Sequence, residues 1–250
     1  MTLAYDLSGR VDAPVLLLGP SLGTTRAMWA PQHPVLSQRF LVLRYDLLGH
    51  GDSAVPPGPY TVDQLADEVL ALLDSLRITR CHYGGVSLGG MIGMTLAARH
   101  PDRIDRLALL CTSAHLPPPK GWLDRADQVK AHGTASIADV VVARWFTPAF
   151  TGQDPYVAML AATPDEGYAA CCAAIAVMDL RPVLSGITAP TLVIAGHDDP
   201  ATPPDHGRLI ADSIPGARFV ELADASHLAG VERPDDVTKL LLDHLGGNDV

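Results

Sequence analysis

The residues with the clearest chemical potential lie in Gly85-Val86-Ser87-Leu88-Gly89, a match to the Gly-x-Ser-x-Gly pattern of a nucleophilic serine. In this pattern the serine occupies a very tight turn between a strand and a helix, with a strained backbone and an accessible hydroxyl. Small residues must flank the turn because strand and helix almost touch there. Gly85, Gly89 and Gly90 meet that requirement. The pattern is short, so the surrounding elements and the partner residues decide its meaning.

An activated serine needs a base within hydrogen-bond reach and an acid that orients the base. Asp198 and Asp199 follow one apolar, strand-like run late in the chain, and His227 follows the next such run. The order serine, aspartate, histidine is the order expected with this nucleophile pattern. We therefore predict Ser87, Asp199 and His227 as catalytic residues, since Gly-x-x-Asp is the usual spacing after the strand. Asp198 is the alternative acid, because predicted strand ends can shift by one residue.

The negative charge that develops during serine attack needs two backbone N–H donors, an oxyanion hole. One donor should be Leu88, which directly follows the nucleophile. The other should be Leu22, in a loop of small residues that follows an apolar strand near the N-terminus. No group of His, Cys, Asp and Glu has the spacing of a metal site, and the sequence predicts neither a metal nor a cofactor.

The elements around Ser87 fit this chemistry. An apolar run over Cys81–Gly85 predicts a strand that leads into the serine turn, and Leu88–His100 predicts the helix that follows it. Strands alternate with helices along most of the chain, which indicates a largely parallel sheet with helices on both faces. The two predicted catalytic partners also follow strands, at the sheet edge where such folds place their sites.

The alternation breaks in the middle of the chain. Pro117-Pro118-Pro119 is followed by helical patterns, including one over Ser136–Phe146, and no strand pattern is visible before about residue 182. We predict an α/β core formed by residues 1–115 and 186–250, with an inserted helical cap over residues 116–185.

Composition limits the class of protein. The chain has 250 residues, 48% of them hydrophobic, and a formal net charge of -10. Such a charge argues against nucleic acids and anionic membranes as partners. The four cysteines lack disulfide or metal spacing and are expected to be reduced and buried. With no signal peptide and no membrane-spanning run, the sequence predicts a cytoplasmic protein and leaves its oligomeric state open.

Taken together, these residues resemble the α/β-hydrolase superfamily over essentially the whole chain. More narrowly, the chain resembles the 3-oxoadipate enol-lactone hydrolases of bacterial aromatic catabolism. The stretches that carry this resemblance are Ser21-Leu22-Gly23-Thr24, Met28-Trp29-Ala30-Pro31-Gln32, Arg44-Tyr45-Asp46, Gly49-His50-Gly51, Gly58-Pro59-Tyr60-Thr61, Leu96-Ala97-Ala98-Arg99-His100, Ala143-Arg144-Trp145-Phe146 and Asp198-Asp199-Pro200-Ala201-Thr202-Pro203-Pro204. Leu48 departs from the arginine that many relatives carry before Gly-His-Gly, a difference that bears on loop packing.

The resemblance implies an α/β-hydrolase fold with a mostly parallel, eight-stranded sheet, flanking helices and an inserted helical cap. It also implies hydrolysis of 3-oxoadipate enol-lactone to 3-oxoadipate in protocatechuate and catechol catabolism, through an acyl-enzyme on the serine. The alternatives within this fold are a general carboxylesterase and a C–C bond hydrolase. An alternative of another class is a non-catalytic, hydrolase-like receptor that closes its cap over a ligand.

A small anionic lactone as substrate would need a cation in the pocket. The basic residues of the predicted cap are Lys120, Arg125, Lys130, Arg144 and Arg181. We predict Arg144 as the residue that binds the substrate carboxylate and Trp145 as a pocket wall, because the two end an apolar helical pattern. The alternative for Arg144 is a solvated charge that complements the helix dipole, and for Trp145 simple packing within the cap.

Overall fold

The computed structural model describes residues 2–246. One seven-stranded sheet runs through the molecule in the order β1-β3-β2-β4-β5-β6-β7, with β1 antiparallel to β3 and every other pair parallel. The strands are β1 (Tyr5–Gly9), β2 (Val15–Gly19), β3 (Leu41–Tyr45), β4 (Cys81–Val86), β5 (Ile104–Leu110), β6 (Thr191–Gly196) and β7 (Arg218–Leu222). The expectation of eight strands is wrong for the described residues. The apolar runs of residues 2–246 form only seven strands, and the antiparallel strand β1 lies at one edge of the sheet.

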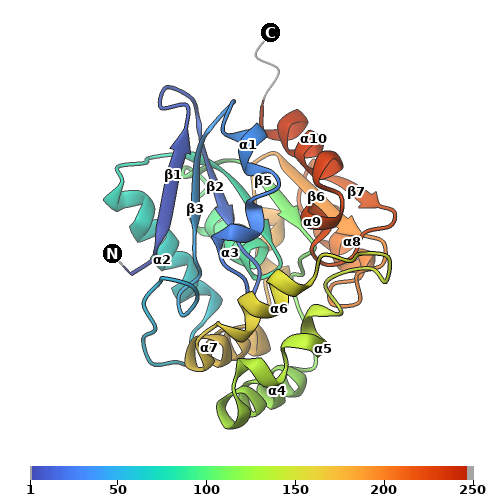
Figure 1. Cartoon of the computed structure of the whole chain (residues 1–250). Helices are drawn as coiled ribbons and strands as arrows, with labels where there is room; N and C mark the ends of the chain where they lie inside the picture. Colours follow the sequence, from blue (N-terminus) through green and yellow to red (C-terminus); the bar gives the residue numbers. More distant parts are fainter. Residues whose placement is uncertain (1, 247–250) are drawn as a thin grey trace.

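Helices pack on the sheet and beyond one of its ends (Figure 1). α3, directly after the serine turn, packs on β2, β4 and β5 and against α2, whereas α10 reaches β5 and also contacts α1. The helices are α1 (His33–Leu36), α2 (Val62–Ser75), α3 (Leu88–Arg99), α4 (Pro119–His132), α5 (Ala138–Val142), α6 (Asp154–Ala161), α7 (Asp165–Val177), α8 (Pro204–Ser213), α9 (Ala229–Glu232) and α10 (Pro234–Leu245).

Burial explains why the central strands are so apolar. Every residue of β4 and of β6 is buried, as expected for parallel strands covered on both faces. The four cysteines are free and buried in this interior, as predicted. The surrounding helices show the complementary pattern. In α2, for example, a capping box between Thr61 and Gln64 fixes the start, and one apolar face lies in the core.

Between β5 and β6 the described chain forms α4, α5, α6 and α7 and no strand, in agreement with the helical pattern of that segment. Figure 1 shows these helices, coloured green to gold, gathered beyond one end of the sheet. The helix predicted over Ser136–Phe146 is much shorter, because α5 ends at Val142 and the chain then turns. This segment, residues 116–185, is called the cap below. Of the predicted core, residue 1 and residues 247–250 lie outside the described residues.

Within residues 2–246, no helix combines the length and the apolar character that crossing a membrane would require.

Candidate active site

Ser87 lies in the strained turn that its sequence pattern predicts. It follows β4, precedes α3 and has φ 54° and ψ −116°, a conformation that few residues other than glycine adopt. The neighbouring glycines are required by contact. A Cβ atom on Gly89 would lie 2.5 Å from the Gly19 carbonyl oxygen, and one on Gly90 would lie 2.7 Å from the Thr112 side chain. The prediction that small residues must flank the turn is confirmed.

Asp199 and His227 meet beyond the ends of β6 and β7. His227 Nδ1 lies 2.8 Å from Asp199 Oδ2, and both side chains are buried. Burial by itself would raise the pKa of Asp199, but the charge and hydrogen bond of His227 and the hydrogen bonds of Thr202 bring it below its ordinary value. The carboxylate therefore stays ionised and holds the proton on Nδ1, which leaves Nε2 free to accept one. Asp198, the alternative acid, is exposed.

Thr202 completes the surroundings of Asp199. Its hydroxyl donates to Asp199 Oδ2 at 2.7 Å, and the backbone N–H groups of Ala201 and Thr202 donate to Oδ1 at 2.8 and 3.1 Å. Sequence reasoning did not assign this role. The signal that was available is the spacing, since an aspartate often accepts hydrogen bonds from N–H groups two and three residues later.

The two predicted oxyanion donors belong to different elements, because Leu88 is the first residue of α3 and Leu22 lies in the loop after β2. The backbone N–H of Gly89, the residue after Leu88, donates to the Pro20 carbonyl at 3.1 Å. This hydrogen bond ties the start of α3 to the loop that contains Leu22. The backbone N–H of Gly23, the residue after Leu22, donates to Nε2 of the buried His50 at 3.0 Å. Among the described residues, the amides of Leu22 and Leu88 themselves have no hydrogen-bond acceptor, so both remain available to an oxyanion.

One pocket brings these groups together. Ser87 and His227 both line it, without a hydrogen bond between their side chains in this structure, and catalytic hydrogen bonds often tighten only when substrate binds. The other lining residues are Ser21, Leu22, Leu116, Trp122, Arg125, Val141, Trp145, Tyr168, Ala201 and Thr202. Loops from the carboxyl ends of the strands thus form the floor, and the cap supplies most of the walls.

The structure separates the two residues predicted to bind substrate. Trp145 is buried and lines the pocket, and its carbonyl accepts a hydrogen bond from Leu228 beside His227. Arg144 does not line the pocket. It is exposed and donates to the Pro200 carbonyl at 3.2 Å. The cause is the early end of α5 at Val142: the turn that follows directs Arg144 outward and Trp145 inward.

Arg125 is the basic cap residue that lines the pocket, and its place was not predicted. Its guanidinium lies over the Trp122 ring, 4.7 Å from the ring centroid. The two residues are three positions apart on α4, next to the helix face that buries Ala126 and Val129. That spacing was the available signal, because residues three apart on a helix share a face.

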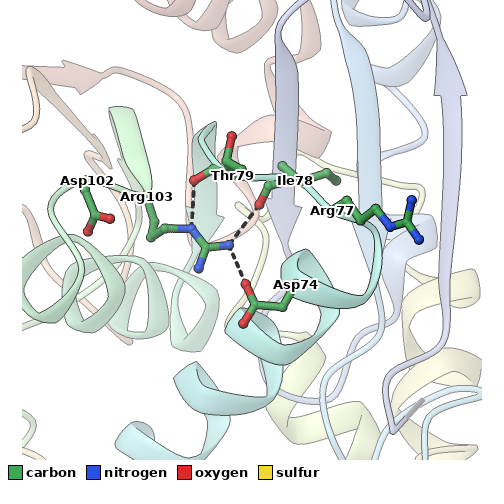
Figure 2. A pocket seen from close by; sticks show the side chains of 6 residues that line it. All are labelled: Asp74, Arg77, Ile78, Thr79, Asp102 and Arg103. Carbon is green, nitrogen blue, oxygen red and sulfur yellow. Dashed lines mark hydrogen bonds and ion pairs between the residues drawn. The ribbon is translucent and has the colours of Figure 1, made fainter.

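A second hollow lies at the opposite end of the sheet, before the first residues of β4 and β5, and holds no comparable site (Figure 2). There the Arg103 guanidinium donates to the carbonyls of Thr79 and Ile78 at 2.7 and 2.8 Å and to Asp74 at 2.7 Å. Arg103 thereby fastens the connection between α2 and β4. Its hydrogen bonds have a structural purpose, and neither a serine nor a histidine is among the residues that line this hollow.

The sheet topology, the strained serine and the Asp199–His227 pair are features of one class of protein. Residues 14–234 match the family described as alpha/beta hydrolase fold. The chain belongs to the α/β-hydrolase family, and it is a hydrolase.

Individual relatives narrow the resemblance. The chain is 38% identical over 239 residues to 3-oxoadipate enol-lactonase 2 of Acinetobacter baylyi, an alignment that covers 94% of this chain and 89% of the relative. The crystal structure of the enol-lactonase from Burkholderia xenovorans LB400 superposes with a TM-score of 0.95 at 46% identity, covering 98% of this chain and 96% of that one. The chain is also 33% identical over 254 residues to RutD of Stutzerimonas stutzeri, whose name describes a carbamate hydrolase, with 96% of each chain covered.

Proposed function

We propose that the protein hydrolyses 3-oxoadipate enol-lactone to 3-oxoadipate in the catabolism of protocatechuate and catechol. The observation that carries the proposal is the pocket in which Ser87 and the Asp199-bound His227 meet under the cap. The similarity to enol-lactonases over nearly the whole chain, including the cap, supports the lactone as substrate.

In the proposed mechanism His227 accepts the Ser87 proton through Nε2 as the serine attacks the lactone carbonyl. Asp199 keeps the imidazole in the required tautomer and stabilises the imidazolium that forms. The amides of Leu22 and Leu88 stabilise the oxyanion. Collapse of the tetrahedral intermediate breaks the ring C–O bond and expels an enolate, which takes the proton from the His227 imidazolium and remains tethered to the acyl chain. Water activated by His227 then releases the acyl group from Ser87.

The proposal includes a cytoplasmic location and the division into an α/β core and a cap. The four free, buried cysteines are consistent with a reducing compartment. The helices between β5 and β6 supply Trp122 and Tyr168 to the pocket, which is consistent with a cap that selects the substrate.

A second candidate is a broader ester or carbamate hydrolase, which the similarity to RutD favours. Three substrates separate the candidates: the enol-lactone, followed by its ultraviolet absorbance, a neutral p-nitrophenyl ester and a simple carbamate. We expect kcat/KM for the enol-lactone to exceed that for the other two by at least about 100-fold, a preference typical of binding to several substrate groups. Comparable values for all three would contradict the proposal.

The same assay tests the nucleophile. Ser87→Ala should lower kcat for the enol-lactone by at least about 10³-fold, because attack on the carbonyl then has no enzyme nucleophile. Ser113→Ala is a matched control, since Ser113 also follows a strand but hydrogen-bonds to His115 and His206 outside the pocket lining. It should retain the wild-type kcat within about twofold.

A further inference from the structure

One wall of the Ser87 pocket carries a positively charged side chain, Arg125, that has no role in the mechanism above. Arg125 is the only arginine, lysine, aspartate or glutamate among the residues that line this pocket. We propose that Arg125 binds a free carboxylate of the substrate, so that the enzyme selects esters and lactones whose acyl part carries a second, anionic carboxyl group. This inference deepens the proposed function and rests on it for the identity of the natural substrate.

The charge of Arg125 is not neutralised by the protein. Within residues 2–246 no carboxylate lies within 4.0 Å of its guanidinium, although the chain carries an excess of acidic residues. Arg125 is only partly exposed and stands against the aromatic ring of Trp122. A guanidinium in such surroundings interacts more strongly with an anion than one in open water. An incoming carboxylate would supply the counter-charge that is missing.

The geometry of Arg125 suits a carboxylate. A guanidinium stacked on an aromatic face keeps its N–H groups pointing out along its edge, where they can bind both oxygens of a carboxylate. The Trp122 ring therefore holds the guanidinium in place without accepting a conventional hydrogen bond from it. The stack also reduces the entropy that the long side chain loses when a ligand binds.

Tyr168 provides a second donor beside Arg125. Its side chain is fully buried and lines the same pocket. Burial raises the pKa of the Tyr168 hydroxyl, and the positive charge of Arg125 offsets only part of that rise, so the phenol remains protonated. A protonated phenol keeps its O–H, so Tyr168 can donate a hydrogen bond to a ligand oxygen.

The other basic residues of the cap are engaged elsewhere. Lys120 pairs with Asp124 at 2.7 Å and Arg181 with Asp179 at 2.6 Å. Lys130 lines a different pocket, together with Glu166 and Asp127. Arg144, the residue predicted from the sequence, is exposed outside the pocket.

The test compares two chromogenic esters with acyl chains of equal length, p-nitrophenyl hydrogen succinate, which is anionic, and p-nitrophenyl butyrate, which is neutral. Arg125→Met retains much of the packing on Trp122 but removes the charge. We expect it to lower kcat/KM for the anionic ester about 10- to 100-fold, the range of a charge-assisted hydrogen bond. The neutral ester should change by less than about threefold. Arg125→Lys should recover part of the loss, because lysine restores the positive charge but not the paired N–H donors of the guanidinium.

Two control variants sharpen the result. Lys130→Met removes one positive charge from the same helix outside the pocket and should leave the ratio of the two kcat/KM values unchanged. Arg144→Met tests the residue that the sequence favours. If Arg144→Met, and not Arg125→Met, lowers activity on the anionic ester selectively, the inference is wrong. Equal losses on both esters for Arg125→Met would also overturn it, because they indicate a structural effect.

The inference and the proposed function can fail separately. In one outcome the enzyme hydrolyses p-nitrophenyl hydrogen succinate in an Arg125-dependent manner but leaves the enol-lactone intact. This result would support the carboxylate site and contradict the proposed substrate. Efficient hydrolysis of the enol-lactone by Arg125→Met would keep the proposed function and overturn the site. If Arg125→Met does not fold, as judged by circular dichroism, Arg125→Lys decides. A selective loss on the anionic ester supports the site, and an unchanged ratio overturns it.

Discussion

The serine turn and the cap build the same pocket by different means. Around Ser87 the positions of atoms follow from the backbone, because Gly85, Gly89 and Gly90 leave no room for side chains and force one path on the chain. In the cap the same pocket is lined by side chains of α4, α5 and α7, whose direction depends on where each helix ends. The shape of the serine turn is therefore encoded locally, whereas the cap side of the pocket depends on how the cap helices pack.

The largest expected effect is on the catalytic side of this comparison. Asp199→Asn should lower kcat about 10³- to 10⁴-fold, because an amide cannot stabilise the imidazolium and favours the wrong tautomer. Asp198→Asn is the matched control, one residue earlier and exposed, and should stay within about twofold of wild type. Both are measured on p-nitrophenyl acetate. A larger loss for Asp198→Asn would show that the alternative acid is the functional one.

The loop that carries Leu22 should respond to pH through His50. Burial lowers the pKa of His50 from its ordinary 6.5 to about 4, and its Nε2 must be neutral to accept from Gly23. Since the unfolded chain binds this proton more readily, the stability contribution is complete above pH 6.5. It falls as the pH drops towards 4, by up to about 3 kcal/mol in the free energy of unfolding.

The measurement is the free energy of unfolding by urea at pH 7 and at pH 4.5, for the wild type and for His50→Gln. The glutamine oxygen can accept the same hydrogen bond but does not titrate, so the variant should lose less stability on acidification. Equal pH dependence for both proteins would show that His50 is not the titrating group.

The smallest expected effect concerns how the cap sits on the core. A Cβ atom on Gly167 of α7 would overlap the backbone of Gly49, so Gly167→Ala should push the cap away and lower stability by about 1–3 kcal/mol. Gly121 of α4 has no atom within 4 Å of such a Cβ, and Gly121→Ala should be neutral or stabilising by up to about 1 kcal/mol. Thermal unfolding of both variants checks the contrast. A destabilised Gly121→Ala beside an unaffected Gly167→Ala would contradict it.

The strand before Ser87, the helix after it and the helical segment between β5 and β6 could all be predicted, because periodicity and small-residue turns are local properties of a chain. The number of strands inferred from resemblance was too high by one, because that number came from the superfamily and not from the apolar runs of this chain. The helix predicted over Ser136–Phe146 was too long, because its apolar pattern continues past the point where the backbone turns at Val142.

The sequence by itself determined the type and order of the chemical groups: a serine between glycines, then an aspartate, then a histidine, each after a strand. Only the tertiary structure decided which neighbours reach the pocket. It placed Asp199 rather than Asp198 against His227, and Arg125 rather than Arg144 in the wall of the pocket that Ser87 lines. The physical reason is direction. A small change in backbone path can turn a side chain to the opposite side, both for neighbours along a chain and for residues near the ends of short helices. Packing against distant segments then decides which of these side chains is buried in the site.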